Sequence, residues 1–171
     1  IIGSLTLTGG ATAFAGYIIQ IGDDSLFVSL LLTMLTCLVL GMGIPTIPNY
    51  IITSSIAAPA LLELGVPLIV SHMFVFYFGI MADLTPPVAL AAFAAAPIAK
   101  ESGLKIGVRA VQIAIAGFVV PYMAVYAPEL MLQGDKGVEA TLYVVSKALL
   151  AVTLWGTAVV GHFRSPMNAL E

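Results

Sequence analysis

The stretch Leu40-Gly41-Met42-Gly43-Ile44-Pro45-Thr46-Ile47-Pro48-Asn49-Tyr50 decides the fold of this chain. It lies near the middle of a run from residue 25 to residue 62 that contains no charged side chain. No continuous helix can pass through two glycines and two prolines, because proline lacks the N–H that the helix ladder requires. We therefore expect this stretch to form the tip of a helical hairpin, and we expect the function to sit there.

The composition of the chain indicates a membrane protein. Of its 171 residues, 60% are hydrophobic and 9% are charged, and the mean hydropathy is +1.09, whereas soluble domains carry about 25% charged residues. A cleaved targeting sequence does not explain this, because apolar segments recur from end to end and no basic leader precedes them. Since the chain begins at Ile1, we expect it to be a fragment of a longer protein.

Charge and cysteine content exclude several classes of function. The net charge of −3 is scattered, and no basic stripe is present, which argues against a nucleic-acid partner. The lone Cys37 lies in apolar surroundings without a second cysteine, so it offers neither a disulfide nor a thiolate metal site. We expect Cys37 to be a buried structural thiol.

Polar links divide the chain into apolar segments, which predict an all-α, polytopic membrane protein. The predicted membrane segments cover residues 1–21, 25–62, 66–99, 108–127 and 140–161. Lys and Arg favour cytoplasmic loops, so the basic cluster within residues 100–109 should face the cytoplasm. The link at residues 129–139 is then outside, and Arg164 returns inside as part of a cytoplasmic tail. Counting backwards, both ends of the 25–62 run face outside.

Segment lengths predict two interruptions. At 1.5 Å per residue, the arms 25–40 and 49–62 reach about 24 Å and about 21 Å, short of the hydrocarbon core of about 30 Å. We therefore favour a re-entrant hairpin over two short tilted helices. The segment 66–99 would span about 50 Å as one helix, so we expect it to break at Thr85-Pro86-Pro87. Such a break must face protein or a wet cavity.

The prolines at both interruptions suggest a cation site. In a helix, a proline removes the hydrogen bond to the carbonyl four residues earlier. The carbonyls expected to be freed by Pro45, Pro86 and Pro87 are those of Gly41, Ala82 and Asp83. If the two breaks meet within the membrane, they form a cluster of uncharged oxygens, which suits a hard cation such as sodium.

The helices that restart after the breaks suggest an anion site beside it. We expect Thr46 or Ile47 to begin the returning arm of the hairpin, and Thr85 to cap a half-helix opened by Pro86-Pro87. Helix N-termini carry partial positive charge and attract anions, most simply a carboxylate. Asn49 and Thr53 give the returning arm a polar face that could contact this substrate.

Several motifs resemble the large permease subunit of tripartite ATP-independent periplasmic (TRAP) transporters, closest to the fused permeases that work with TAXI-type solute-binding proteins. The resemblance covers residues 1–128. It rests on Gly41-Met42-Gly43-Ile44-Pro45-Thr46, Ala58-Pro59-Ala60-Leu61, Leu64-Gly65-Val66, His72-Met73-Phe74-Val75-Phe76-Tyr77-Phe78 and Leu84-Thr85-Pro86-Pro87-Val88-Ala89-Leu90-Ala91.

The resemblance implies a sodium-coupled elevator transporter of the bacterial cytoplasmic membrane. Such a transporter has two inverted repeats, each with a hairpin and a broken helix. It works with a periplasmic solute-binding protein and a small permease subunit or its fused equivalent. Residues 1–128 would be half of the transport domain, the second repeat, and residues 129–171 would add the periplasmic link, the last helix and the tail.

The resemblance also implies ligands by position. The implied sodium ligands are Gly41, Gly43, Ala82, Thr85 and Val88. The family more often has glycine where this chain has Ala82 and Ala89. Ligation by a backbone carbonyl survives an alanine unless that position needs a positive φ.

We expect sodium-coupled import of an organic anion, with no cofactor other than the coupling ion, no transition metal and no covalent chemistry. The residues expected to contact the substrate are Pro45, Thr46, Asn49, Thr53, Asp83, Pro86 and Pro87. One alternative is an ion channel whose re-entrant loop forms the filter. A second is an intramembrane enzyme with Asp83 as acid or base, which lacks a second carboxylate within the membrane. The sequence leaves the identity of the substrate open.

Overall fold

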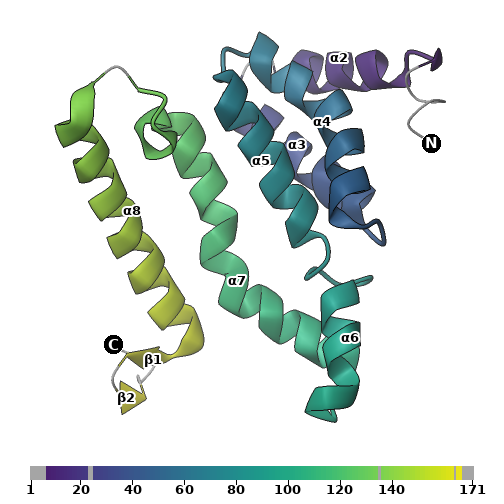
Figure 1. The fold of residues 1–171 in the computed structure, drawn as a ribbon, viewed down its shortest axis with the longest axis vertical. Coiled ribbons are helices and arrows are strands. Elements are labelled where there is room, and N and C mark those ends of the chain that lie inside the picture. The colour runs from purple at the N-terminus through teal and green to yellow at the C-terminus, as the bar shows by residue number, and fades with distance from the viewer. Residues whose placement is uncertain (1–6, 23–24, 135, 164, 167–171) are drawn as a thin grey trace.

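The computed structural model describes residues 7–22, 25–134, 136–163 and 165–166. Within these ranges the chain forms seven α-helices, a short 3-10 helix and a pair of two-residue strands, which confirms the predicted all-α class. The elements are α2 (Gly10–Gly22), α3 (Leu26–Gly41), α4 (Thr46–Glu63), α5 (Leu68–Met81), α6 (Leu90–Ala99), α7 (Gly103–Tyr126), η1 (Pro128–Met131), α8 (Gly137–Val160), β1 (His162–Phe163) and β2 (Ser165–Pro166). The two strands pair antiparallel next to the end of α8 (Figure 1).

Two of the described helices, α7 and α8, are long and apolar enough to cross a membrane. Each has 24 residues, or about 36 Å, which exceeds the hydrocarbon thickness of about 30 Å. Helices α3, α5 and α6 are also apolar, but they have 16, 14 and 10 residues. Their lengths of about 24, 21 and 15 Å are too short to cross a bilayer singly. The apolar segments are therefore interrupted where the sequence predicts interruptions.

The helix ends differ from the predicted segments in detail. Helix α7 begins at Gly103, earlier than the predicted residue 108, because the Ser102 hydroxyl caps it by accepting a hydrogen bond from the Lys105 N–H at 3.4 Å. Helix α8 ends at Val160, where Gly161 adopts a left-handed conformation. For the predicted span 1–21, residues 1–6 lie outside the described part. Helix α2 covers only its second half and lies across one end of the α3–α5 bundle (Figure 1).

The core lies between the α3–α4 hairpin and α5. The largest fully buried side chains include Phe74 and Phe78 of α5, Leu30 of α3 and Leu61 of α4. Tyr122 of α7 packs against this core, with ring centroids 5.4 Å from Phe74 and 5.9 Å from Phe78 in edge-on geometry, the arrangement that aromatic quadrupoles favour. The hairpin and α5 thus form one packed unit, which the C-terminal half of α7 joins.

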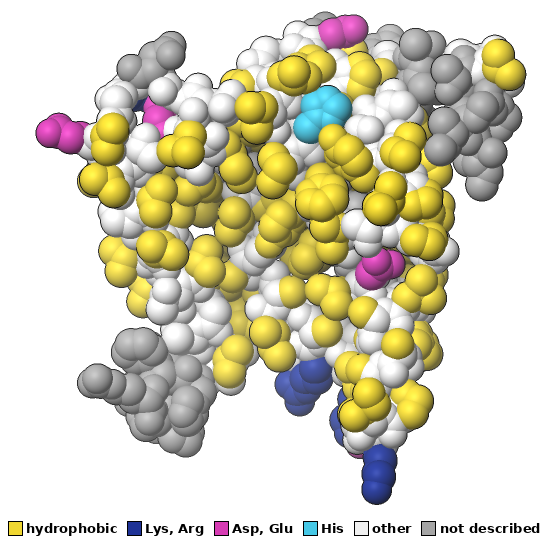
Figure 2. Space-filling model, in the orientation of Figure 1, with side chains coloured by type: hydrophobic (Ala, Val, Ile, Leu, Met, Phe, Trp, Pro, Cys, Tyr) yellow, Lys and Arg dark blue, Asp and Glu magenta, His cyan; other side chains and the backbone are white. Residues whose placement is uncertain are grey.

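Apart from Asp83 and Lys147, the charged side chains of the described residues lie near the two ends of the molecule. Figure 2 shows apolar side chains over its middle and Lys and Arg at the end where α6 meets α7. The opposite end, at the α4–α5 connection and η1, carries Glu63 and Glu129. Lys136 donates a hydrogen bond to the Glu129 carboxylate at 2.9 Å and holds the pKa of Glu129 below its usual value. This is the charge distribution that the predicted orientation requires.

Candidate functional site

The predicted hairpin tip is a short reversal between two helices. Helix α3 ends at Gly41 and α4 begins at Thr46, one of the two residues predicted to begin it. Gly43 has a φ of +77°, which L side chains rarely adopt. Pro45, with a φ of −57°, is the N-cap of α4. The stretch that decides the fold therefore reverses the chain at residues 42–45, and α3 and α4 pack against each other as a helical hairpin.

The second interruption separates α5 from α6 at residues 82–89. The prediction that Thr85 caps a half-helix with Pro86-Pro87 in its first turn is wrong. The Thr85 hydroxyl donates to the Met81 carbonyl at 2.8 Å, and the Pro86–Pro87 bond is cis. Helix α6 begins only at Leu90, because its N-cap Ala89 leaves helical geometry with a φ of 39°.

The carbonyls predicted to be free find other donors. The Gly41 carbonyl accepts from the Ile44 N–H at 3.3 Å, and that of Ala82 from the Thr85 N–H at 3.2 Å. The Asp83 carbonyl accepts from the Ala91 N–H at 3.1 Å. The chain leaves helical geometry at each break, so nearby N–H groups reach these oxygens. Each carbonyl oxygen still has a second lone pair with which it can bind a cation.

The two interruptions lie in direct contact. The Asn49 amide of α4 is buried and donates to the Gly79 carbonyl of α5 at 2.8 Å. A Cβ added to Gly41 would lie 2.7 Å from the Ala82 Cβ, 2.7 Å from the Asn49 Nδ2 and 2.9 Å from the Gly79 oxygen. The close approach of the hairpin tip to α5 therefore requires glycine at position 41, because any side chain there would overlap these atoms. We call this contact the tip–break junction: Gly41, Asn49, Gly79 and Ala82.

Gly79 is a junction residue that the sequence reasoning missed. The available signal was its spacing from Ala82, since small residues at neighbouring turns of an apolar helix let a second backbone approach. The loop after α5 also borders the tip at a second point, because a Cβ added to Gly43 would lie 3.8 Å from Val88 Cγ1. Of the implied sodium ligands, Gly41, Gly43, Ala82 and Val88 thus lie where the tip meets the break.

The remaining predicted residues surround the junction at different depths. Thr85 lies in the same loop, partly buried, with its hydroxyl bound to Met81. Thr53 is fully buried and donates to the Asn49 carbonyl at 2.9 Å, which places it next along α4. Thr46 is half-buried at the start of α4. Pro45 and Pro87 are exposed, and Pro86 and Asp83 are half-buried.

Two side-chain oxygens at the interruptions have no partner within the described residues. The Asn49 Oδ1 and the Asp83 Oδ1 are both buried and accept no hydrogen bond there. A buried acceptor left unpaired costs about 1–3 kcal/mol, so such atoms point to a bound ion or water. Both are hard oxygen donors, the type of ligand that hard cations take. Each is therefore a candidate ligand for such a cation.

Other chemistry finds less support in the described part of the chain. Within it, no group of three or more His, Cys, Asp or Glu side chains is placed to hold a metal ion.

Ala82 has a φ of −59°, so this position needs no glycine and its carbonyl keeps the orientation of a helix end. Ala89 is instead the position with a positive φ, at 39°.

Known families provide an independent comparison. A sequence model described as "Tripartite ATP-independent periplasmic transporter, DctM component" matches residues 1–135. No curated protein and no solved structure matches the chain. The matched range ends in the link before α8, so it contains the hairpin, the break and the whole tip–break junction.

Proposed function

The chain belongs to the DctM family of tripartite ATP-independent periplasmic transporters, which are secondary transporters, and from this premise we propose that it imports an organic anion together with sodium. The simplest such substrate is a carboxylate. A periplasmic solute-binding protein, of the TAXI type by resemblance, delivers it to the bacterial inner membrane. A small permease subunit or a fused equivalent completes the transporter. Sodium is the coupling ion, and no other cofactor takes part.

The observation that carries this proposal is the tip–break junction. A cation bound there contacts both interruptions at once, through the carbonyls of Gly41 and Ala82 and the free oxygen of Asn49. Because the ion bridges the hairpin and α5, its binding favours the closed arrangement of the two. Gly43, Thr85 and Val88 line the same place on the loop side and complete the proposed ligand set.

The anion binds beside the cation. Helix α4 directs its N-terminus, at Pro45 and Thr46, toward the junction end of the hairpin, and the N–H groups of a first helical turn favour negative charge. Thr53, Pro86 and Pro87 extend the proposed contact surface. Asp83 repels an anion until a cation neutralises it. This repulsion gives a physical reason for coupling, because the substrate binds well only after sodium.

The hairpin is proposed to be re-entrant. Its arms α3 and α4 have 16 and 18 residues, or about 24 and 27 Å, so the tip stops inside a hydrocarbon core of about 30 Å. An elevator motion then carries the hairpin, α5 and the site between them across the membrane as one unit. The buried core shared by these three helices is consistent with such a rigid unit.

The test is uptake by the full-length permease reconstituted in liposomes with its binding protein. We expect substrate to enter only with an inward sodium gradient, and a matched potassium gradient is the control. Sodium-independent uptake would contradict the proposal. Thr85→Ala should raise the sodium concentration needed for half-maximal uptake, and an unchanged requirement would remove Thr85 from the ligand set.

The junction itself is tested by Gly41→Ala. The added methyl overlaps three atoms of the junction, and overpacking of this kind costs about 1–3 kcal/mol, so we expect sodium-driven uptake to fall about tenfold or more. Gly156→Ala in α8 is the matched control, because nothing lies within 4 Å of its added Cβ. Equal uptake by both variants would show that the junction does not contribute to transport.

A further inference from the structure

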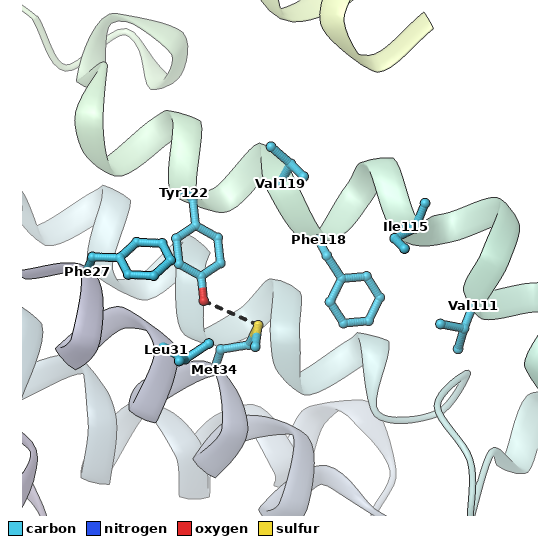
Figure 3. Close-up of a pocket in the computed structure, with 8 residues that line it drawn as sticks. All are labelled: Phe27, Leu31, Met34, Val111, Ile115, Phe118, Val119 and Tyr122. Carbon is cyan, nitrogen blue, oxygen red and sulfur yellow. Dashed lines mark hydrogen bonds between the residues drawn. The ribbon is translucent and has the colours of Figure 1, made fainter. Parts of the chain in front are cut away.

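An apolar groove outside the tip–break junction runs between α3 and α7. Its volume is about 510 Å³, and Figure 3 shows the side chains that line it. They include Phe27, Leu31 and Met34 of α3 and Ile115, Phe118 and Tyr122 of α7. The Tyr122 hydroxyl donates to the Met34 sulfur at 3.3 Å, so it is already bound. The groove therefore offers its occupant apolar contacts.

The groove runs from an aromatic end, at Phe27 and Tyr122, toward the basic start of α7. The rings of Phe27 and Tyr122, with centroids 5.8 Å apart, lie together at one end, and Val111 lies at the other (Figure 3). Beyond Val111, toward the start of α7, a second hollow is lined by Leu104, Lys105, Val108, Arg109 and Gln112. Val108, Val111 and Ile115 follow at intervals of three and four residues, so the two hollows share one side of the helix.

The second hollow carries a positive charge that no carboxylate within the described residues pairs with, at Arg109. Arg109 donates to the Gln112 side chain at 3.0 Å, and no carboxylate within the described residues pairs with it. Lys105 pairs with Glu101 at 2.9 Å, but both side chains are about half exposed or more, so this pair contributes little and opens readily. The basic end can therefore bind a negative group without displacing a buried partner.

The length of the groove matches one leaflet of a bilayer. From Val111 to Tyr122, α7 rises about 16 Å, and one leaflet of hydrocarbon is about 15 Å thick, half of the whole core. The basic end of α7 is the predicted cytoplasmic side, where anionic lipids are concentrated and basic pockets between membrane helices bind their headgroups.

We propose that this groove binds one anionic phospholipid. Its phosphate contacts Arg109 and Lys105, and one acyl chain follows α7 as far as the Phe27–Tyr122 pair. A free phosphate ion would leave the apolar groove unfilled, and a zwitterionic lipid carries an ammonium group beside its phosphate, which weakens its attraction to Arg109 and Lys105. The surrounding membrane supplies this lipid at high local concentration. The bound chain fills the space between the hairpin arm α3 and the full-length helix α7.

Native mass spectrometry of the full-length permease in detergent tests the headgroup contact. The probes are phosphatidylglycerol and phosphatidylcholine with identical acyl chains, and we expect phosphatidylglycerol to bind more tightly. Arg109→Gln should weaken this binding about fivefold, the loss expected when one basic residue is removed near an anionic headgroup. Lys136→Gln is the control, since Lys136 is also an exposed basic residue but lies near η1, at the other end. Equal binding of the two lipids would overturn the proposal.

A second pair of variants tests the acyl chain. Ile115→Trp fills the groove and should reduce bound phosphatidylglycerol, whereas Ile113→Trp should not, because Ile113 is 67% exposed and does not line the groove. Helical circular dichroism shows that each variant is folded, and the exposed Arg109→Gln change provides a test even if Ile115→Trp does not fold. Unchanged binding in both Ile115→Trp and Arg109→Gln would overturn the proposal, and so would a concentration-dependent dimer that excludes lipid.

Discussion

Ala89 holds the most unusual backbone conformation at the break between α5 and α6. Its φ of 39° and ψ of 52° are left-handed, which costs an L residue roughly 1–2 kcal/mol. Two hydrogen bonds hold it there: the Ala89 N–H donates to the Thr85 carbonyl at 3.2 Å, and the Ala89 carbonyl accepts from the Phe93 N–H at 3.0 Å. The turn before α6 and the first turn of α6 thus fix Ala89 from both sides.

Glycine substitutions at Ala89 and Ala82 should differ for this reason. Both alanines are fully buried, so each substitution removes one buried methyl and adds the same freedom to the unfolded chain. Only Ala89→Gly also relieves a left-handed conformation. We expect its free energy of unfolding to exceed that of Ala82→Gly by about 1–2 kcal/mol, measured by thermal or denaturant unfolding in detergent. Equal losses would show that Ala89 is not strained.

Residue identity predicts where the helices are interrupted, but it does not predict which N–H groups then bond the carbonyls at the interruptions. Gly41, Pro45 and Thr46 mark the tip correctly, because helix geometry forbids a continuous ladder through them. The new donors for the Gly41 and Ala82 carbonyls come from loop conformations that no local pattern specifies. The contact between Asn49 and Gly79 joins residues 30 positions apart, so it depends on how α4 packs against α5.

At the scale of elements, a second polar contact ties the start of α4 to α5. The Tyr50 hydroxyl of α4 lies 2.9 Å from the Nδ1 of His72 in α5. The Tyr50 ring also meets Phe76 edge-on, with centroids 5.4 Å apart. His72, which the sequence places inside an apolar segment, therefore has a structural partner. Together with the Asn49 contact, it fixes the first turns of α4 against α5, at Gly79 and at His72.

Removing the Tyr50 hydroxyl should loosen this contact. Tyr50→Phe keeps the ring packing but deletes one partly buried hydrogen bond, so we expect a loss of about 1 kcal/mol in the free energy of unfolding. Tyr143→Phe in α8 is the matched control, because its ring is 60% exposed and no change is expected. In a His72→Ala background, Tyr50→Phe should cost much less. A full additional loss there would mean that the two side chains do not interact.

Segment lengths predict the existence of the helices better than their ends. The arms of the hairpin and the interruption before α6 follow from proline positions and from the bilayer thickness. The start of α6 at Leu90 does not, because Pro86-Pro87 reads as a first helical turn, whereas the left-handed Ala89 places the helix start after it. The end of α8 at Gly161 follows ordinary capping by glycine, which the sequence shows directly.

At the scale of the whole molecule, a surrounding bilayer explains why large apolar side chains are exposed, which a soluble fold would bury. Many large apolar side chains are exposed along α8, including Leu149, Leu154 and Trp155. Only 6% of the most apolar window of α8 is buried within the described structure. In lipid these side chains are already in an apolar solvent, so they need no protein partner. The basic residues at the α6–α7 connection then predict that this end faces the cytoplasm.

Cysteine labelling distinguishes a re-entrant hairpin from two full spans. Cys37 is fully buried and should react slowly, so single cysteines can be introduced as Glu63→Cys, Ser102→Cys and Ile47→Cys. With a membrane-impermeant thiol reagent, we expect Glu63→Cys to react in intact cells and Ser102→Cys only after permeabilisation. Ile47 is 74% exposed in the protein, so slow reaction of Ile47→Cys under both conditions would place the tip within the membrane. If Ile47→Cys instead reacts as fast as Ser102→Cys after permeabilisation, α3 and α4 cross completely and the hairpin is not re-entrant.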